Sequence, residues 1–419
     1  MELAKQLALA LEAWVRSTFH QEEDGGDGKA RSRKLAEARA FQGERRLTSL
    51  LKLARSNPAI VVRPEELDAK PMLLNSPTAT IDLETGKARA HDPADLLTQM
   101  TGCEWPESGI RSEDPPRYLR MLTDIFAGST EMIEYMQRAL GYSFTGSTRE
   151  RVMVILFGRT MNGKSTLEGL TRRIAGDYAI TTRPATFMAA AFENEGKRAA
   201  MAGLRGKRIV QMGESRETDR LDEGIVKSVT GGDLIETKRM GENPITFRPL
   251  FKLWLATNHL PAVSNTDEAV WNRLHPVPFT RNIAEVMKAR GEAVLGTDEA
   301  VQSIFEEEAP RILAWIVRGC LKWQQQRGLN PPPAVTNARE HHRQEMDPVT
   351  PFVEECCDIG DNRQVRVTEL RQGYFRWCRD NNHQPLPPKV FDGAVAAKFP
   401  RRKSSGYETW HGITLGRAS

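Results

Sequence analysis

The chain has 419 residues, of which 39% are hydrophobic, so it is long enough for two or three rather polar globular domains. No apolar run approaches the length of a membrane span, and the first residues form an amphipathic helical pattern instead of a signal peptide. Lysine and arginine number 59 against 55 aspartates and glutamates, so overall charge does not indicate nucleic-acid binding, and any DNA contact has to come from local basic residues.

Residues 1–145 predict a mostly helical domain that contains one hairpin. Helical spacing covers residues 1–20 and 29–56, strand-like alternation covers 79–83 and 87–91, and two further helices are predicted over 117–127 and 130–140. The acidic segment 22–28 predicts a mobile loop between the first two helices. Arginines in the 29–56 helix form either a DNA-facing strip or a solvated helix face, and the pattern alone does not decide between them.

Residues 146–330 predict an α/β domain with a mainly parallel sheet flanked by helices, because short apolar runs alternate with helical periodicity. The strands are predicted over residues 151–157, 178–181, 208–212, 251–257 and 274–279. A helix over Ala309–Gln325 follows, and Pro331-Pro332-Pro333 ends it and marks a linker.

Residues 331–419 predict a linker helix and a small C-terminal domain. Its helices are predicted over residues 349–357, 368–381 and 389–398, and its strands over 364–367 and 407–413. The basic residues Arg401, Arg402 and Lys403 are predicted to lie in a turn before the last strand. Helices followed by a basic hairpin indicate a winged-helix fold, whose hairpin grips DNA phosphates. Winged helices also serve as protein-docking modules, so both roles stay open.

The most informative stretch is the loop that follows the first predicted strand of the α/β domain. It fits G-x-x-x-x-G-K-[ST] at every position, between a strand and a helix, as a phosphate-binding loop requires. Backbone N–H groups at the helix N-terminus would face the phosphates of ATP, Lys164 would reach the β- and γ-phosphates, and Ser165 would hold Mg²⁺. The candidate nucleotide-binding residues are Gly158, Arg159, Thr160, Met161, Asn162, Gly163, Lys164, Ser165 and Thr166.

Polar residues follow two further predicted strands of this domain. Glu214 comes after the strand 208–212 and is a candidate for ordering the Mg²⁺ shell or polarising the attacking water, whereas Gly213 stands where a paired acid is common. Asn258 follows the strand 251–257 and would lie beside the γ-phosphate, since open α/β sheets bind ligands at the carboxyl ends of their strands. In isolation, a surface glutamate and a simple turn are the alternatives.

Basic residues outside the loop are candidates for a second set of roles. Arg273 precedes the last strand and could enter a neighbouring subunit's site as an arginine finger, although a surface salt bridge is the commoner fate of an arginine. Lys238 and Arg239 lie between two short strand runs, and such a hairpin could present them to single-stranded DNA in a ring channel. A plain surface hairpin is the alternative.

Together these segments resemble superfamily 3 helicases, most closely the primase-helicases of poxvirus, phage and plasmid type. The resemblance lies in FGRTMNGKSTLEGL, GKRIVQMGESRE, KSVTGGDLIETKRMGE, FKLWLATNHLP and DEAVWNRLHPVPF, which match that family's A, B, B′ and C motifs and its arginine finger in order and spacing. Residues 74–141 look like the family's lead-in domain and the C-terminus like its winged helix, so the resemblance covers nearly the whole chain.

The resemblance implies an AAA+-like ATPase core and a role for each motif residue. Lys164 and Ser165 would bind phosphate and Mg²⁺, Glu214 would be the catalytic acidic residue and Asn258 the sensor. Arg273 would act on the neighbouring subunit, and Lys238 with Arg239 would track DNA. By family, the active form is a hexameric ring that translocates along single-stranded DNA, usually 3′-to-5′.

The sequence differs from the usual pattern of this family in two features. Gly213 replaces one acid of the usual pair. Relatives often carry an upstream primase domain, whereas residues before 75 hold no carboxylate cluster suited to two-metal nucleotidyl transfer. We therefore expect no primase activity in this chain, and a separate primase or initiator protein as a partner.

The expected function is ATP-dependent DNA unwinding for replication of a phage, plasmid or integrated element. The alternative is an ATP-regulated initiator or control protein that binds DNA without unwinding it. A small-molecule kinase shares the phosphate loop, but the Asn258 and Lys238 motifs argue against it. The five cysteines form no C-x-x-C pair, which favours the cytoplasm over export, and Cys356 with Cys357 is predicted to lie on one helix.

Overall fold

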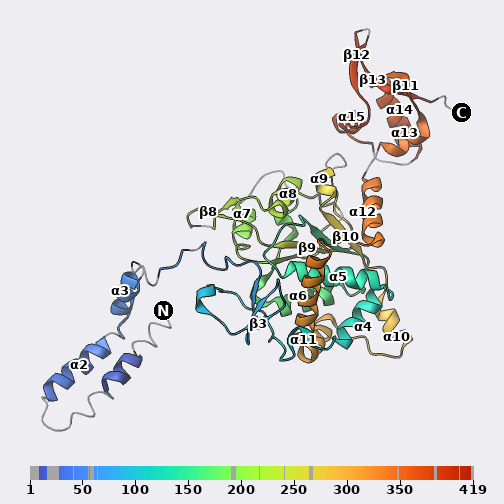
Figure 1. Cartoon of the computed structure of the whole chain (residues 1–419). Coiled ribbons are helices and arrows are strands. Elements are labelled where there is room, and N and C mark those ends of the chain that lie inside the picture. Colours follow the sequence, from blue (N-terminus) through green and yellow to red (C-terminus); the bar gives the residue numbers. More distant parts are fainter. Residues whose placement is uncertain are drawn as a thin grey trace. The chain divides into compact units, whose positions relative to one another are not determined.

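The structure is a computed structural model, and Figure 1 traces its elements. It describes residues 9–16, 28–40, 42–54, 56, 61–63, 65–189, 195–216, 218–239, 241–263, 268–346, 349–381, 385–404 and 406–416. The chain forms two compact units, residues 1–69 and residues 70–419. Among the described residues, no helix combines the length and the apolar character needed to cross a membrane.

The first unit is helical, as its leucine spacing predicts. Residues 9–16 are helical, and α2 (Gly28–Ala40) and α3 (Glu44–Ala54) follow. Leu47 is the buried residue of α3. Arg16 and Arg39 both bind the carboxylate of Glu12 and lower its pKa to about 2, so Arg39 is engaged within the unit. The predicted acidic loop lies outside the described residues, apart from Gly28.

A five-stranded parallel sheet organises the second unit, as the alternation of apolar runs and helices predicts. The strands are β4 (Met153–Phe157), β5 (Ala179–Thr182), β6 (Ile209–Met212), β9 (Lys252–Thr257) and β10 (Leu274–Pro278). Their order in the sheet is β10-β4-β9-β6-β5, and every neighbouring pair is parallel. The strand that carries the phosphate loop therefore lies beside β9, and β9 separates it from β6.

Helices cover both faces of this sheet because its central strands are apolar on both sides. In β4, Val154 and Leu156 belong to one hydrophobic cluster, whereas Met153 and Ile155 belong to the other. The first face is covered by α4 (Pro116–Ile125), α5 (Thr130–Ser143), α6 (Lys164–Ala175) and α11 (Thr297–Gln325). The second is covered by α7 (Glu195–Ala202), α8 (Glu223–Gly231) and α9 (Glu268–Trp271). The remaining helices of the unit before the C-terminal region are α10 (Ile283–Ala289) and α12 (Pro333–Glu345).

The helix predicted over Ala309–Gln325 begins earlier than the sequence indicates. It starts at Thr297 and contains Pro310. A proline inside a helix removes one backbone hydrogen bond, but buried residues on both sides of it, such as Ile304 and Ile312, pack α11 against the sheet. At its crossing with α5 the two backbones nearly touch, since a Cβ on Gly319 would lie 2.0 Å from the carbonyl oxygen of Gln137. Tertiary packing therefore overrides the proline signal.

Two buried cations hold the end of α5. Arg208 donates from Nη1 to the carbonyl oxygen of Phe144 at 2.6 Å, and Lys252 donates to the carbonyl oxygens of Thr145 and Leu250. Cations at a helix C-terminus complement its dipole and satisfy carbonyl groups that have no partner within the helix. Burial and the neighbouring Arg208 keep the pKa of Lys252 well below its usual value. These contacts fix α5 against the amino ends of β6 and β9.

Smaller sheets flank this core. The predicted hairpin is present as β2 (Thr80–Asp82) and β3 (Ala88–Arg89), and β1 (Leu73–Asn75) adds a third antiparallel strand. The basic residues Lys238 and Arg239 follow β7 (Ile235–Thr237), which pairs with β8 (Ile245–Phe247) as a two-stranded antiparallel hairpin.

The C-terminal region combines three helices with a three-stranded antiparallel sheet of order β11-β13-β12. Its elements are α13 (Thr350–Cys356), β11 (Cys357–Arg366), α14 (Val367–Asp380), α15 (Pro388–Ala396), β12 (Arg401–Ser404) and β13 (Tyr407–Leu415). Two predictions are corrected. Arg401–Lys403 lie in a strand and not in a turn, because they pair with β13. Cys356 ends α13 and Cys357 begins β11, so the two cysteines do not share a helix.

Candidate nucleotide-binding site

A cavity lies at the carboxyl ends of β4, β9 and β6 and contains the phosphate loop. This main cavity has a volume of about 580 Å³, within the range of small-molecule sites. Parallel strands end at the same edge of a sheet, so the segments that follow β4, β9 and β6 meet there. Its lining residues include the loop residues 160–166, Gly213, Glu214 and Asn258.

The phosphate loop, Gly158–Ser165, keeps its shape through two glycines and one asparagine. Gly158 has φ 147°, and a Cβ there would lie 2.1 Å from the carbonyl oxygen of Phe279. Gly163 has φ 88° at the N-terminus of α6, which also favours glycine. The buried side chain of Asn162 donates to the Phe279 carbonyl oxygen at 2.9 Å. The loop is thus tied to the residue that follows β10.

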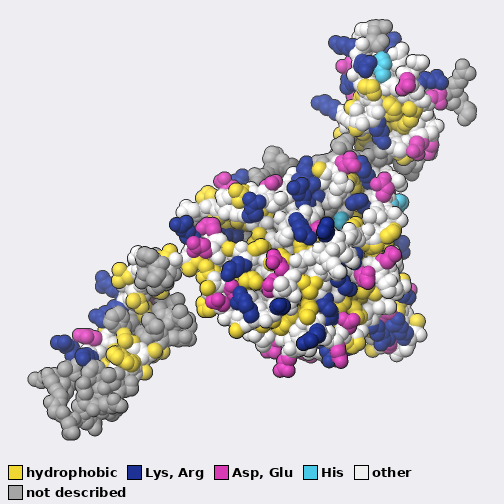
Figure 2. All heavy atoms as spheres, viewed as in Figure 1, with side chains coloured by type: hydrophobic (Ala, Val, Ile, Leu, Met, Phe, Trp, Pro, Cys, Tyr) yellow, Lys and Arg dark blue, Asp and Glu magenta, His cyan; other side chains and the backbone are white. Residues whose placement is uncertain are grey.

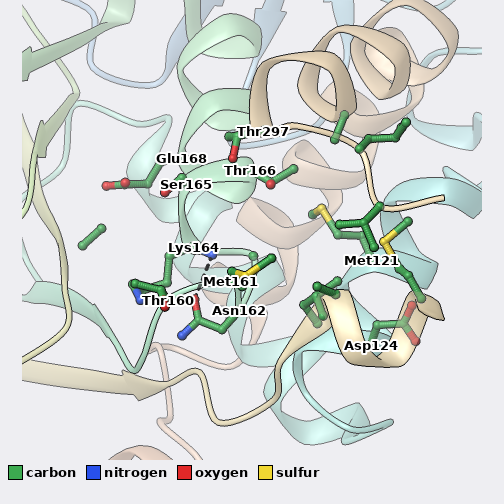
Figure 3. A pocket seen from close by; sticks show the side chains of 18 of the residues that line it. Met121, Asp124, Thr160, Met161, Asn162, Lys164, Ser165, Thr166, Glu168 and Thr297 are labelled. Atoms are coloured by element: carbon green, nitrogen blue, oxygen red, sulfur yellow. Dashed lines mark hydrogen bonds between the residues drawn. The ribbon is translucent and has the colours of Figure 1, made fainter. Parts of the chain in front are cut away.

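Lys164 lies at the centre of the loop, where its side chain turns back over the residues before it (Figure 3). Its Nζ donates to the carbonyl oxygens of Gly158 at 2.5 Å and Arg159 at 2.9 Å, and to Oδ1 of Asn162 at 3.1 Å. Burial lowers the pKa of Lys164, and the nearby carboxylates of Glu214 and Glu168 oppose that shift.

Asn258 joins the loop to the end of β6. Its Oδ1 accepts from Lys164 Nζ at 3.3 Å, and its Nδ2 donates to Glu214 Oε1. Next to Glu214 and Asn258 in the sequence, the hydroxyl oxygens of Ser215 and Thr257 are hydrogen bonded at 2.8 Å. This bond joins the ends of β6 and β9. Three residues that the sequence singled out, 164, 214 and 258, therefore form one hydrogen-bonded series across three strands.

The remaining candidates lie apart from the main cavity. Arg273 does not line it; its Nε donates to Thr230 Oγ1 at 3.0 Å and its Nη1 to the carbonyl oxygen of Ala269. Lys238 and Arg239 are exposed after β7. On β12, Arg401 forms ion pairs with Asp392 and Glu408, while Arg402 and Lys403 are exposed. Figure 2 shows lysines and arginines spread among acidic side chains, in keeping with the small net charge.

Half of the main cavity comes from elements that the sequence reasoning did not assign to it. Beyond the loop its wall is largely apolar, with Met121 from α4, Ile283 and Met287 from α10, and Leu295. Asp124, which lines the cavity, forms a two-pronged ion pair, in which Arg290 Nη1 donates to Asp124 Oδ2 at 2.8 Å and Nη2 to Oδ1. The hydrogen bonds to Asp124 raise the pKa of Arg290. The partners are 166 positions apart, so no local pattern links them.

Glu168 is a further residue at the cavity that the sequence reasoning left out. It lies on α6 beside Ser165 (Figure 3), and burial raises its pKa to about 8. Lys164 and Arg172 oppose that shift. The sequence places Glu168 at the cavity only through its spacing. It lies four residues after Lys164, and residues four apart share a helix face.

Three family models match successive stretches of the chain. They are D5 N terminal like over residues 3–127, a family of unknown function (DUF5906) over residues 156–273, and Poxvirus D5 protein-like over residues 344–411. The chain thus carries D5-type domains at both ends, which confirms the resemblance to the poxvirus-type proteins that its motifs indicate.

Individual relatives come from viruses. "Putative helicase L207/L206" of Acanthamoeba polyphaga mimivirus is 25% identical over 331 residues, which cover 75% of this chain and 34% of the relative. "Putative helicase 022R" of Frog virus 3 (isolate Goorha) is 27% identical over 258 residues, which cover 59% of this chain and 26% of the relative. The chain is a distant homologue of these proteins and spans about a third of their length or less.

The fold also has a solved counterpart. The apo structure of NrS-1 C terminal region (305-718) aligns with a TM-score of 0.50 at 12% sequence identity, over 88% of this chain and 90% of that one. At this identity the likeness concerns the fold alone.

Proposed function

We propose that this chain is an ATP-dependent DNA helicase that moves along single-stranded DNA as a ring, for replication of a phage, plasmid or integrated mobile element. The observation that carries the proposal is the hydrogen-bonded series Lys164–Asn258–Glu214 at the edge of the parallel sheet. The sheet order supports an AAA+-like core, because β9 with its polar end lies between the loop strand and the Glu214 strand. The names of the viral relatives point in the same direction.

ATP would bind with its phosphates on the loop and its base at the apolar end of the main cavity. The N–H groups at the start of α6 and the Lys164 ammonium would hold the β- and γ-phosphates. The wall formed by Met121, Ile283 and Met287 would take the flat apolar faces of the base. Both parts find a place in this cavity because residues of α4 and α10 line it together with the loop.

Magnesium fits the donors at this edge, which are oxygen atoms, the ligands that Mg²⁺ prefers. Within the described part of the chain no three His, Cys, Asp or Glu side chains are grouped to hold a metal by themselves, and Mg²⁺ usually takes only one or two protein ligands together with phosphates and waters. Ser165 and Glu214 would hold it here. Bound Mg²⁺ would neutralise charge on the β- and γ-phosphates.

Glu214 and Asn258 would act on the attacking water. The Asn258 amide donates to one oxygen of the Glu214 carboxylate, and this bond would hold the carboxylate so that its second oxygen can bind a water molecule. An amide in this place binds water without competing for its proton. Arg273 does not line its own chain's cavity, so its role would be exercised on the ATP of the neighbouring subunit, which makes a ring, expected to be a hexamer, part of the catalytic unit.

DNA contact is assigned to two basic groups. Lys238 and Arg239, exposed after β7, would follow the phosphates of single-stranded DNA in the channel. The C-terminal region, with its three helices and three-stranded antiparallel sheet, would act as a winged helix, and Arg401, Arg402 and Lys403 on β12 would contact duplex or forked DNA.

The test is an unwinding assay on forked DNA with ATP and Mg²⁺, together with ATPase measurements with and without single-stranded DNA. The wild-type chain should separate the strands, and Lys164→Ala should lose both activities. Tight sequence-specific duplex binding without strand separation would favour the initiator alternative. ATP hydrolysis by Lys164→Ala at the wild-type rate in the presence of DNA would overturn the site.

A further inference from the structure

One carboxylate beside the phosphate loop is not used by the function proposed above. Glu168 lies on α6, and its side chain is next to Ser165 in Figure 3. It lines both the main cavity and an adjoining hollow of about 530 Å³. Its Oε1 is fully enclosed and has no hydrogen-bond partner among the described residues. A buried acceptor without a partner is unfavourable, so this carboxylate calls for a functional explanation.

Gly213 lies across the same hollow, at the end of β6. It lines both cavities with Ser165 and Glu168. A Cβ built on Gly213 would meet nothing within 4 Å, so the space in front of this backbone is open. A carboxylate at that position is the usual partner of the loop hydroxyl in P-loop enzymes, where it holds Mg²⁺. Here β6 contributes only Glu214, and α6 brings a second carboxylate to the same place.

We propose that Glu168 supplies from α6 the carboxylate that Gly213 cannot supply from β6, and that it positions the water shell of the nucleotide-bound Mg²⁺. The proposal rests on the proposed function, since it concerns the same site. Glu168 is a positioning residue: its carboxylate accepts a hydrogen bond from metal-bound water, while the metal's protein ligands remain Ser165 and Glu214. Carboxylates that hold a metal's surroundings in this way typically change metal affinity about 10- to 100-fold when removed.

The test measures Mg²⁺ affinity without relying on turnover. A fluorescent, non-hydrolysable ATP analogue is titrated into the full chain in EDTA and at increasing Mg²⁺. Glu168→Gln should bind the analogue in EDTA as the wild type does, but should need about tenfold more Mg²⁺ for half-maximal tightening. Glu168→Gln with Gly213→Asp should recover a large part of the loss, because the carboxylate returns from β6. Glu134→Gln, an exposed position on α5 outside both cavities, is the matched control.

Each outcome decides the proposal. An unchanged Mg²⁺ requirement in Glu168→Gln refutes the role of Glu168 and leaves the nucleotide site standing, provided that Lys164→Ala abolishes binding. A wild-type chain that binds no analogue at any Mg²⁺ concentration overturns the proposed function and this inference with it. If Glu168→Gln does not fold, Glu168→Asp takes its place: a raised Mg²⁺ requirement supports the proposal, and a wild-type requirement refutes it. A loss that Gly213→Asp does not reduce indicates a structural role only.

Discussion

Replacing Asn258 by aspartate tests the hydrogen-bonded series at the sheet edge. The substitution turns the side-chain amide into a carboxylate of almost the same shape. The amide Nδ2 that donates to Glu214 becomes a carboxylate oxygen, whereas the oxygen 3.3 Å from Lys164 Nζ remains an acceptor. The substitution therefore removes one donor to a carboxylate and adds one negative charge between Lys164 and Glu214.

The two charge effects largely offset each other. At about 4 Å, a pair of charges near a protein surface interacts by about 4 kcal/mol; the new carboxylate repels Glu214 and attracts Lys164. What remains is the lost hydrogen bond to a charged group, worth about 1.5–3 kcal/mol. If Glu214 needs this support in the transition state, kcat should fall by about 10- to 100-fold, since 1.36 kcal/mol is tenfold.

The measurement is steady-state ATPase with saturating single-stranded DNA, accompanied by nucleotide-binding and thermal denaturation of the same preparations. Asn258→Asp should unfold at the wild-type temperature, because both Asn258 and Glu214 reach solvent. Asn330→Asp is the control: it makes the same chemical change at an exposed position outside the main cavity. A wild-type kcat in Asn258→Asp, or an equal loss in Asn330→Asp, would refute the role given to this amide.

Three other predictions concern stability, pH and assembly. Lys252→Met removes the Lys252 donor from the carbonyl groups of Thr145 and Leu250, so the free energy of unfolding should fall by about 1–3 kcal/mol per carbonyl group in urea titrations; no change would contradict the capping role. Burial lowers the pKa of His275 to about 4, so the folded state resists protonation. Stability should therefore be full above the unfolded-state value of about 6.5 and decline as pH falls towards 4, by up to about 3 kcal/mol. His275→Phe should weaken this decline and the exposed His341→Gln should not, as urea titrations at pH 7 and 5 would show. Mixing Arg273→Ala with Lys164→Ala subunits should restore part of the ATPase, and no recovery at any ratio would count against an arginine acting between subunits.

The strands and the loop could be predicted because their signals are local. Apolar runs such as Arg151–Phe157 end at glycine, and the loop pattern occupies consecutive positions. Their polar neighbours Glu214 and Asn258 could be singled out for the same reason. The hydrogen bond between these two side chains depends on β9 lying beside β6, and sheet order is set by packing of the whole domain.

The rest of the site rests on contacts between distant parts of the chain. The pair Asp124–Arg290 joins α4 to the residue after α10, and neither position carries a motif. The start of α11 at Thr297 lies before Pro310, and buried residues on both sides of this proline, such as Ile304 and Ile312, keep the helix intact where local propensity does not favour it. Glu168 was overlooked since an acidic residue in the second turn of a helix is common; its enclosure is visible only in three dimensions.

Because α4 forms part of the wall of the main cavity, the position at which a fragment of the protein begins decides whether the cavity is complete. Met121 and Asp124 lie in α4, before the phosphate loop in the sequence, and α5 shares one hydrophobic cluster with β4 and α11. A fragment that starts at residue 146 would expose that cluster and lose the part of the cavity wall that α4 supplies. We expect such a fragment to aggregate, whereas one that starts near residue 70 should remain monodisperse and retain the complete cavity. Light scattering and analogue binding on the two fragments would separate these outcomes.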